Sequence, residues 1–468
     1  MGFAWAVGGL AETLLAAAHA CLALAAAMHA LLSKPDPRSA FGWIAVVMLF
    51  PFAGPMLYYL FGINRVRARA KTLRTPEVLA LNSRSVTSHP QDSPLKRIGD
   101  AITQWPCVGG NSVEPLFDAE HAFGSMLAAI ETAQRSVWLA TYIFETDAVG
   151  RGFIRALAAA QARGVAVRVL IDGVGEWYSW PHSVALLRRC GVRAARFLPP
   201  QLLPPRISLN LRNHRKLLVV DGHTCFVGGM NIGGRELATA RGGGMRDLHC
   251  KVSGAVTVHF AAAFATDWAF VSKERLTLPE AVQPRGESLC RVVTDGPDED
   301  VDKLLLIIVG AVSAAVQRVI IMTPYFVPPP ELVAALQAAA LRGIDVSILI
   351  PARSNLRYVD WATRRWLPPL LERGVRVFLQ PPPFAHTKLL VVDSEYVQIG
   401  SANIDQRSLR LNFEIAMEIY DPAICVQLAG FAQGAIAKSS AFTLQDAERR
   451  TFPARLRDSL FWLLSPYL

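Results

Sequence analysis

Charged residues and lysines are scarce in this chain of 468 residues. Charged residues make up 18% and hydrophobic residues 52% of the sequence, which excludes disorder as the dominant state. The 48 basic residues outnumber the 38 acidic ones, so the formal net charge is +10 and favours anionic partners such as phospholipid surfaces or nucleic acid. Only nine of the basic residues are lysines, so the position of each lysine is informative.

Closely spaced cysteine pairs are also missing. The seven cysteines are scattered, and no two of them form a C-x-x-C pair. This spacing excludes a zinc ribbon and argues against a disulfide framework.

Long hydrophobic runs are confined to the N-terminal part of the chain. Mean hydropathy is +0.28, high for a wholly soluble protein and too low for a transporter with many spans. Residues 3–32 and 40–62 form two apolar runs, each longer than the roughly 20 residues that cross a bilayer. We therefore expect residues 1–66 to form a transmembrane hairpin of two helices. A cleaved signal peptide is the alternative for the first run, but the run is long and no basic residue precedes it.

Basic residues set the expected orientation of this hairpin. Five of them follow the second run, whereas the turn between the runs offers only Lys34 and Arg38. The positive-inside rule then places the basic stretch and both ends of the chain in the cytoplasm. Residues 67–112 are basic and rich in Ser and Pro, so we expect a linker there. The five basic residues are Arg65, Arg67, Arg69, Lys71 and Arg74.

The rest of the chain repeats a strand and helix pattern. Apolar runs at residues 137–142 and 319–323 read as buried strands, each followed by a helix and a second strand. This alternation predicts an α/β fold with two similar sandwich halves that face each other, at residues 113–280 and 281–440. Residues 441–468 are expected to form an amphipathic tail of the kind that lies at a membrane interface.

A polar motif recurs late in each half. His214, Lys216, Asp221 and Asn231 are matched by the same residue types 172 positions later. The matching residues are His386, Lys388, Asp393 and Asn403. Because residues i and i+2 of a strand share a face, we expect each histidine to lie beside its lysine.

Two such motifs suit reactions of phosphodiesters. Two imidazoles around one point can act as a nucleophile and as a general acid or base on opposite sides of a reacting atom. The two lysines and two asparagines can hold phosphate oxygens and stabilise the charge that develops on them. The sequence shows no compact group of Asp, Glu and His residues typical of a metal site, so we expect neither a metal nor a cofactor.

The paired H-x-K-x-x-x-x-D pattern resembles the phospholipase D superfamily. The N-terminal hairpin narrows the resemblance to the bacterial cardiolipin synthases, whose signatures are similar to residues 41–62, 228–233 and 323–328. The resemblance implies phospholipase D-like halves and a phosphatidyltransferase that makes cardiolipin from two phosphatidylglycerols. It further implies a multi-pass protein of the bacterial inner membrane with the catalytic halves on the cytoplasmic side. The implied partners are phosphatidylglycerol and an anionic phospholipid membrane, and no nucleic acid.

The same resemblance implies roles for individual residues. His214 is expected to be the nucleophile and His386 the acid and base, although the symmetry of the motifs leaves the reverse order open. In the family a downstream carboxylate orients each motif histidine, and on this basis we assign Asp247 to His214 and Glu414 to His386. The motif aspartates Asp221 and Asp393 complete the expected catalytic motifs. In a regular strand they would face away from the lysines, so we interpret them as structural supports.

Other functions remain open at this point. A phospholipase D hydrolase would use the same residues with water in the second step, and a membrane-tethered nuclease would suit the positive charge. A scaffold without catalysis is disfavoured by two complete motifs. The sequence departs from the family pattern at Gly234-Arg235-Glu236 and at Met245, which leaves the acceptor lipid open, as are acyl-chain preference and oligomeric state.

Overall fold

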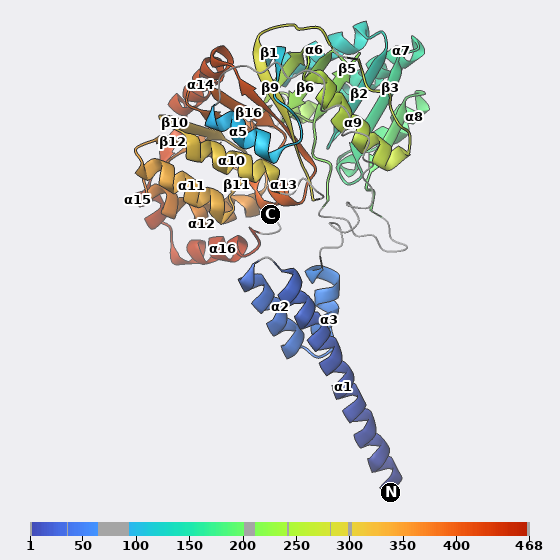
Figure 1. Ribbon diagram of the computed structural model, residues 1–468, viewed down its shortest axis with the longest axis vertical. Coiled ribbons are helices and arrows are strands. Elements are labelled where there is room, and N and C mark those ends of the chain that lie inside the picture. Colours follow the sequence, from blue (N-terminus) through green and yellow to red (C-terminus); the bar gives the residue numbers. More distant parts are fainter. Residues whose placement is uncertain are drawn as a thin grey trace. The chain divides into compact units, whose positions relative to one another are not determined.

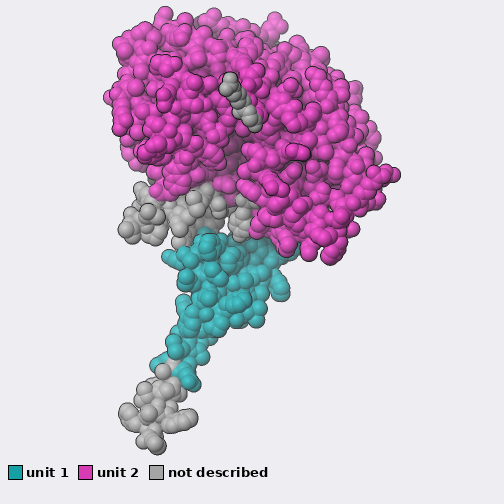
Figure 2. All heavy atoms as spheres, turned by 180° about the vertical axis from the view of Figure 1, so that it is seen from behind, with its two compact units in different colours: residues 1–72 teal, residues 73–468 magenta. Residues whose placement is uncertain are grey.

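The protein has two compact units, which we describe separately (Figure 2). A computed structural model describes residues 2–34, 36–63, 93–200, 211–240, 243–280, 282–297 and 302–465. The first unit ends at Thr72 and the second begins at Leu73. The expected basic stretch at residues 65–74 and most of the expected linker therefore lie outside the described residues.

The first unit confirms only part of the expected hairpin. Helix α1 (Gly2–Ser33) is continuous, and its segment Glu12–Ser33 is long and apolar enough to cross a membrane. The second apolar run is broken instead of forming one helix. It contains α2 (Pro37–Leu49), α3 (Ala53–Leu57) and the π-helix η1 (Tyr58–Gly62). Its longest helix is α2, which at 1.5 Å per residue is only about 20 Å long.

The break in the second run has a local cause. Pro51 interrupts the backbone hydrogen bonds of the helix, and Phe52 adopts a positive φ of 57°. The shorter pieces then fold back against α1. His29 Nδ1 lies 2.7 Å from the Tyr58 hydroxyl, and Lys34 Nζ donates to the carbonyl of Gly62 at 2.6 Å. The expected two-helix hairpin is therefore confirmed only in part.

A 15-stranded sheet runs through the second unit, and both halves contribute to it (Figure 1). The strands of the first half, in spatial order, are β1 (Val108–Phe117), β8 (Leu248–Ser253), β6 (Thr224–Gly228), β5 (Leu217–Val220), β2 (Ser136–Thr141), β3 (Ala166–Asp172) and β4 (Arg193–Phe197). Those of the second half are β9 (Ser288–Asp295), β18 (Glu414–Tyr420), β16 (Tyr396–Gly400), β15 (Leu389–Val392), β10 (Arg318–Met322), β12 (Asp345–Pro351), β13 (Arg376–Gln380) and β19 (Ser440–Phe442).

The two halves repeat one topology. Outward from the antiparallel contact between β1 and β9, the strands of each half follow in an equivalent order, and β19 is added at one edge. Two smaller sheets pair β11 (Phe326–Val327) with β17 (Ile404–Asp405) and β7 (Met245–Arg246) with β14 (Phe384–Ala385). The prediction of an α/β protein with two similar halves is confirmed, and both halves share one continuous sheet.

Helices cover both faces of the large sheet. Alternate residues of β2 contribute to different cores, Trp138 to one face and Val137 to the other, as the strand period requires. One face packs against α9 (Thr257–Ser272) and α14 (Pro422–Ala437). The other face is covered in the first half by α6 (Asp118–Thr132), α7 (Ala148–Ala162) and α8 (Ser183–Arg189), and in the second by α10 (Lys303–Ala314), α11 (Pro330–Leu341) and α12 (Arg357–Leu371).

Two segments differ from the expected boundaries. Residues 94–102 were predicted as linker but form helix α5 (Pro94–Ile102), which lies alongside α10 (Figure 1). The buried Arg291 holds α5 in place by donating to the carbonyl of Lys96 at 3.1 Å. The expected tail begins inside the sheet, because β19 pairs with β13, and continues as α15 (Leu444–Glu448) and α16 (Phe452–Trp462).

Candidate active site

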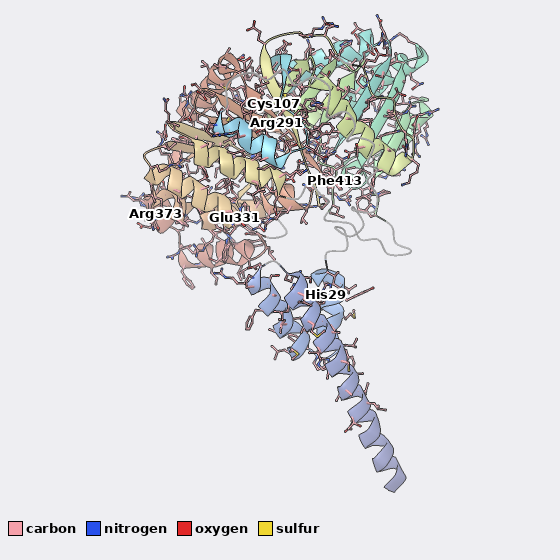
Figure 3. All side chains as sticks on the ribbon, in the orientation of Figure 1. His29, Cys107, Arg291, Glu331, Arg373 and Phe413 are labelled. Atoms are coloured by element: carbon pink, nitrogen blue, oxygen red, sulfur yellow. The ribbon has the colours of Figure 1, made fainter. Side chains whose placement is uncertain are left out.

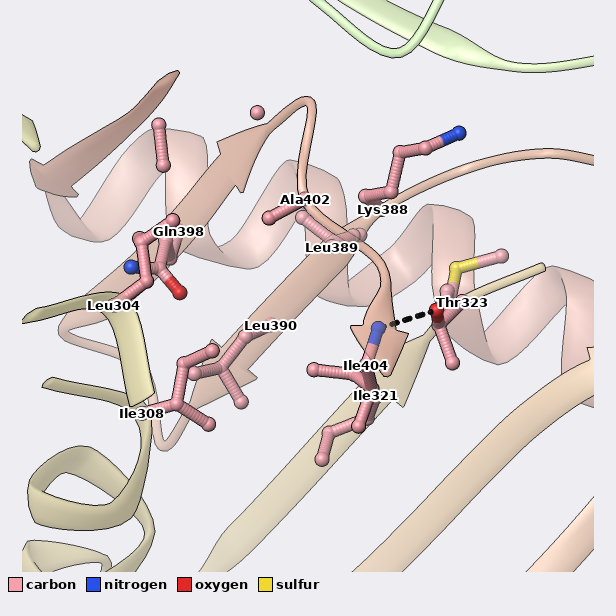
Figure 4. A pocket seen from close by; sticks show the side chains of 13 residues that line it. Leu304, Ile308, Ile321, Thr323, Lys388, Leu389, Leu390, Gln398, Ala402 and Ile404 are labelled. Carbon is pink, nitrogen blue, oxygen red and sulfur yellow. Dashed lines mark hydrogen bonds between the residues drawn. The ribbon is translucent and has the colours of Figure 1, made fainter. Parts of the chain in front are cut away.

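The two histidine motifs lie at equivalent ends of two central strands. The apolar sequence Leu-Leu-Val-Val follows each motif lysine and forms the buried strands β5 and β15. These strands fix the position of the polar residues that precede them. Beneath the second motif is an apolar cavity of about 30 Å³, and the ammonium group of Lys388 points away from apolar lining residues such as Leu390 (Figure 4).

Two short parallel bridges bring the halves together at the motifs. Asn213, just before His214, pairs with Phe413 of the second half, and the His214 N–H donates to the Phe413 carbonyl at 2.9 Å. The equivalent bridge joins β14 to β7, and the His386 N–H donates to the carbonyl of Arg246 at 2.7 Å. Figure 3 labels Phe413 at the junction of the two halves. Each histidine is therefore held by the backbone of the opposite half.

These bridges determine which carboxylate orients which histidine. Phe413 is followed by Glu414, whose two carboxylate oxygens both lie 3.0 Å from Nδ1 of His214. Arg246 is followed by Asp247, whose Oδ2 lies 2.8 Å from Nδ1 of His386. The pairing predicted from the sequence, Asp247 with His214 and Glu414 with His386, was therefore wrong. Each carboxylate therefore contacts the histidine of the other half. The residue that precedes the carboxylate forms a backbone bridge with the residue that precedes that histidine.

In each histidine, Nδ1 is engaged by a carboxylate, and Nε2 is the ring nitrogen available for the reaction. With Nδ1–H donating to a carboxylate, Nε2 is the nitrogen that can act as a nucleophile or carry a proton. Only 13% of the His214 side chain and 9% of the His386 side chain are exposed. Burial lowers the pKa of each imidazole to about 4, although the adjacent carboxylate opposes this shift. Both histidines are therefore neutral in the substrate-free protein near pH 7.

The carboxylates remain ionised despite their burial. Burial alone would raise the pKa of Asp247, but Lys388 and the hydrogen bond from His386 outweigh it and lower this pKa. Burial likewise opposes ionisation of Glu414, whose pKa is nevertheless lowered by His214 and Lys216. Asn412 and Ser401 also donate hydrogen bonds to Glu414. The backbone at Gly229 passes close to the Asp247 carboxylate. A Cβ atom at this position would lie only 2.4 Å from Oδ2 of Asp247.

The two lysines place positive charge beside the histidines. Lys216 Nζ donates to the His214 carbonyl at 2.7 Å, and Lys388 Nζ lies 2.8 Å from His386 Nδ1 and 3.8 Å from Asp247. Burial lowers the pKa of both, that of Lys216 to about 7. A phosphodiester anion in the site would favour their charged forms.

The asparagines hold the loops that close the site. Asn231 accepts from the Ile143 N–H at 3.1 Å and donates to Glu236 at 3.2 Å. Asn403 donates to Ser408 at 3.3 Å, and its buried Oδ1 has no hydrogen-bond partner among the described residues. Each amide nitrogen retains a second N–H that can donate to a phosphate oxygen. Phosphate binding by Asn231 and Asn403 remains a prediction.

The motif aspartates bind backbone outside this cluster. The carboxylate of Asp221 accepts hydrogen bonds from the N–H groups of residues 134–136, at the start of β2. Asp393 does the same for residues 316–318, at the start of β10. Both aspartates adopt a positive φ in the turn after the motif strand. Their place in the fold is that of structural supports, not of groups that touch a reacting atom.

Comparison with known proteins identifies the family. The family model "Cardiolipin synthase, PLD-like domain" matches residues 126–268 and 308–433, more than half of the chain, and a phospholipase D-nuclease N-terminal model matches residues 21–62. The chain is 32% identical over 465 residues to the cardiolipin synthase of Geobacillus kaustophilus, covering 96% of this chain and 92% of that protein. It is 33% identical to cardiolipin synthase A of Pseudomonas entomophila, with 96% of each chain covered. The chain belongs to the cardiolipin synthase family of the phospholipase D superfamily.

A solved structure supports the same fold at lower identity. Phosphatidylserine synthase from Haemophilus influenzae aligns with a TM-score of 0.60 and 16% identity, covering 80% of this chain and all of that one. Cardiolipin synthases are phosphatidyltransferases, so membership of this family makes the chain an enzyme of phospholipid synthesis.

Three groups of residues around the site were not predicted from the sequence. The buried Asp172 accepts from the Asn213 N–H and from Arg212, which fixes the segment before His214. Arg215 pairs with Asp267 at 2.8 Å on the far side of the same segment. These ion pairs carry no local sequence signal, because their members are 40 and 52 residues apart.

The third missed group is Glu236, a fully buried acid. One carboxylate oxygen of Glu236 lies within 4.8 Å of an oxygen of Asp247 and a ring nitrogen of His386. Three such ligand types could hold a metal ion, but Lys216 and Lys388 are close enough to affect the pKa of Glu236 and would repel a divalent cation. A signal existed in the sequence, because Glu236 occupies the position that Ser408 occupies 172 residues later.

Proposed function

We propose that the protein is a cardiolipin synthase that transfers the phosphatidyl group of one phosphatidylglycerol to another. The products are cardiolipin and glycerol. The observation that carries the proposal is the pair of histidines, each oriented through Nδ1 by a carboxylate of the opposite half, with a buried lysine beside each. This arrangement supplies two matched nitrogen bases and positive charge for one phosphodiester.

In the first step, Nε2 of His214 attacks the phosphorus of the donor lipid. The bond from phosphorus to the headgroup oxygen breaks, and the departing glycerol takes a proton from Nε2 of His386. The anionic phosphodiester raises the pKa of His386 on binding, which allows this histidine to carry that proton. A phosphatidyl group remains bonded to His214.

In the second step, the neutral His386 accepts the proton of a primary hydroxyl on a second phosphatidylglycerol. The hydroxyl oxygen attacks phosphorus, the bond to His214 breaks, and cardiolipin leaves. One phosphodiester replaces another, so no energy source is needed. Lys216, Lys388, Asn231 and Asn403 hold the phosphate oxygens in both steps, and no metal or cofactor takes part.

The chemical asymmetry of the site supports this order of the histidines. Glu236 lies within 4.8 Å of a ring nitrogen of His386, whereas the equivalent residue of the second half is the neutral Ser408. An additional group that can bind a proton suits the side where alcohols leave and enter. The reverse order is the second candidate.

The location that fits this chemistry is the bacterial inner membrane. Helix α1 would anchor the chain, and the basic stretch at residues 65–74 would keep the catalytic halves on the cytoplasmic side. For a multi-pass topology, α2, α3 and η1 would have to cross the membrane together. Helix α16 has a row of exposed apolar side chains suited to the surface of an anionic membrane.

Product analysis tests the proposal. The full chain in detergent would receive phosphatidylglycerol labelled in its glycerol headgroup, with chelator present. We expect cardiolipin and an equal amount of free labelled glycerol, and no product from His214→Ala. Phosphatidic acid without cardiolipin would instead indicate the hydrolase, and cleavage of DNA but not lipid would indicate the nuclease.

A further inference from the structure

The environment of Glu236 differs from that of the four acids predicted from the sequence. Asp247 and Glu414 each pair with a histidine, and Asp221 and Asp393 hold backbone N–H groups. The Oε1 atom of Glu236 accepts from Asn231, but its buried Oε2 has no hydrogen-bond partner among the described residues. An unpartnered acceptor at a buried site is unfavourable unless a ligand completes it.

Glu236 is also a point where the two halves differ. Asn231 donates to Glu236 at 3.2 Å, and Asn403 donates to Ser408 at 3.3 Å, so the two residues occupy equivalent places. The helical turn η4 (Gly234–Glu236) carries one and α13 (Gln406–Arg410) the other. Glu236 therefore places a carboxyl group beside His386, and its equivalent in the second half, Ser408, carries a hydroxyl group instead.

Few groups of the substrate can donate a hydrogen bond to Oε2 of Glu236. A phosphodiester has only acceptor oxygens and carries negative charge, so it cannot pair with Oε2 in the carboxylate form of Glu236. An ammonium group could, but the two buried lysines already supply positive charge to the site. A hydroxyl group donates one hydrogen bond without adding charge, and the glycerol headgroup carries two free hydroxyls.

We propose that Glu236 recognises the headgroup. Its free carboxyl oxygen accepts a hydrogen bond from a glycerol hydroxyl, both of the alcohol that leaves beside His386 and of the alcohol that replaces it. The second hydroxyl of the same glycerol is then directed to phosphorus. Glu236 thereby favours polyol alcohols over simple alcohols as acceptors. Burial, reinforced by the charge of Asp247, raises the pKa of Glu236 to about 7, which reduces its repulsion of the phosphodiester. This inference rests on the proposed transfer reaction.

A competition between two soluble alcohols tests the inference. The full-length protein would receive phosphatidylglycerol with glycerol labelled in its carbon chain and labelled ethanol together. The ratio of labelled phosphatidylglycerol to phosphatidylethanol would be measured for the wild type, Glu236→Ser and Glu236→Gln. Both products form at the same active sites, so the ratio does not depend on the fraction of folded enzyme. Ethanol has no second hydroxyl, so its transfer measures attack on phosphorus without a hydrogen bond to Glu236.

We expect both variants to lower the glycerol-to-ethanol ratio by about tenfold, the loss expected for one hydrogen bond to a buried acid. Glu236→Ser copies the residue of the second half, and Glu236→Gln keeps the volume but turns an NH₂ group toward the ligand while Asn231 holds its oxygen. The exposed Glu131→Ser serves as a matched control with the wild-type ratio.

The possible failures are distinguishable. A ratio within twofold of wild type in both variants would overturn the role of Glu236, while transfer itself continues. Where Glu236→Ser does not fold, Glu236→Gln decides alone. A wild type that transfers to neither alcohol and makes no cardiolipin would overturn the proposed function itself.

Discussion

Glu414 in the second half orients His214 in the first, with both carboxylate oxygens 3.0 Å from Nδ1. Asp247 in the first half orients His386 in the second at 2.8 Å. Neither half therefore contains a complete histidine and carboxylate pair. The active site exists only when both halves are folded and joined, which gives a physical reason for one continuous sheet across them.

The crossed pairs predict which variants behave alike. With a phosphatidyl p-nitrophenol substrate the leaving group needs no acid, so only the nucleophilic half-reaction is tested. Glu414→Gln should match His214→Asn and lose the burst of p-nitrophenol by about 100-fold, because a misoriented imidazole attacks poorly. Asp247→Asn should match His386→Asn and retain the burst. A Glu414→Gln variant that behaved like His386→Asn would contradict the crossed arrangement.

The motif aspartates should affect stability more than chemistry. Asp221→Asn weakens three hydrogen bonds to the backbone of residues 134–136, so the free energy of unfolding should fall by about 2–3 kcal/mol. Thermal unfolding would show a melting temperature lower by several degrees, and Asp393→Asn should show the same. Turnover per folded molecule should stay within about twofold of wild type. Activity lost without a change in melting temperature would instead give these residues a catalytic role.

The pH dependence should show a fall in kcat/KM above about pH 7. As pH rises through the pKa of about 7 of Glu236, this acid becomes negative, and as it rises through the pKa of about 7 of Lys216, that cation is lost. Both changes weaken binding of a phosphodiester anion. On the acid side, the pKa of about 4 of His214 keeps the nucleophile neutral down to low pH. The profile would be measured with the phosphatidyl p-nitrophenol substrate in mixed micelles. Its leaving group needs no proton from His386, so the protonation of His386 does not enter kcat/KM.

A variant separates the two ionisations on the alkaline side. Glu236→Gln removes one of them, so log kcat/KM should fall by one unit per pH unit instead of approaching two. Glu372→Gln, at the exposed end of α12, should keep the wild-type slope. An unchanged slope in Glu236→Gln would show that Glu236 does not titrate in this range.

Local patterns predicted the strands and motifs well, and long-range contacts explain what they missed. The spacing of His214 and Lys216 is local, and the repeat at an offset of 172 fixed the two halves. The crossing of Glu414 depends on a backbone bridge between Asn213 and Phe413, which are 200 residues apart and share no pattern. In the first unit, hydropathy measured the length of the second run but not its break, which Pro51 and the positive φ at Phe52 produce.

Helix α16 is amphipathic in the structure, and its two faces differ in what they contact. Asp458 is buried and pairs with Arg450 at 2.6 Å and Arg457 at 2.8 Å, while the Phe461 ring packs on Trp361 of α12 with centroids 4.8 Å apart. The other face is apolar. Its side chains are Phe452, Leu456 and Leu460, and Leu463 and Leu464 follow directly after the helix; these five side chains have exposed fractions of 47% to 75%.

This exposed row predicts a dependence on the form of the lipid. Leu456→Gln with Leu460→Gln should lower activity several-fold on phosphatidylglycerol in vesicles, because α16 would no longer insert its apolar face at the bilayer surface. Activity on short-chain phosphatidylglycerol below its micellar concentration should not change, since no surface is involved. The matched control, Leu306→Gln with Leu341→Gln, alters exposed leucines on α10 and α11 and should leave both activities unchanged. Equal losses on both substrates would point to damaged packing against α12 and not to a membrane contact.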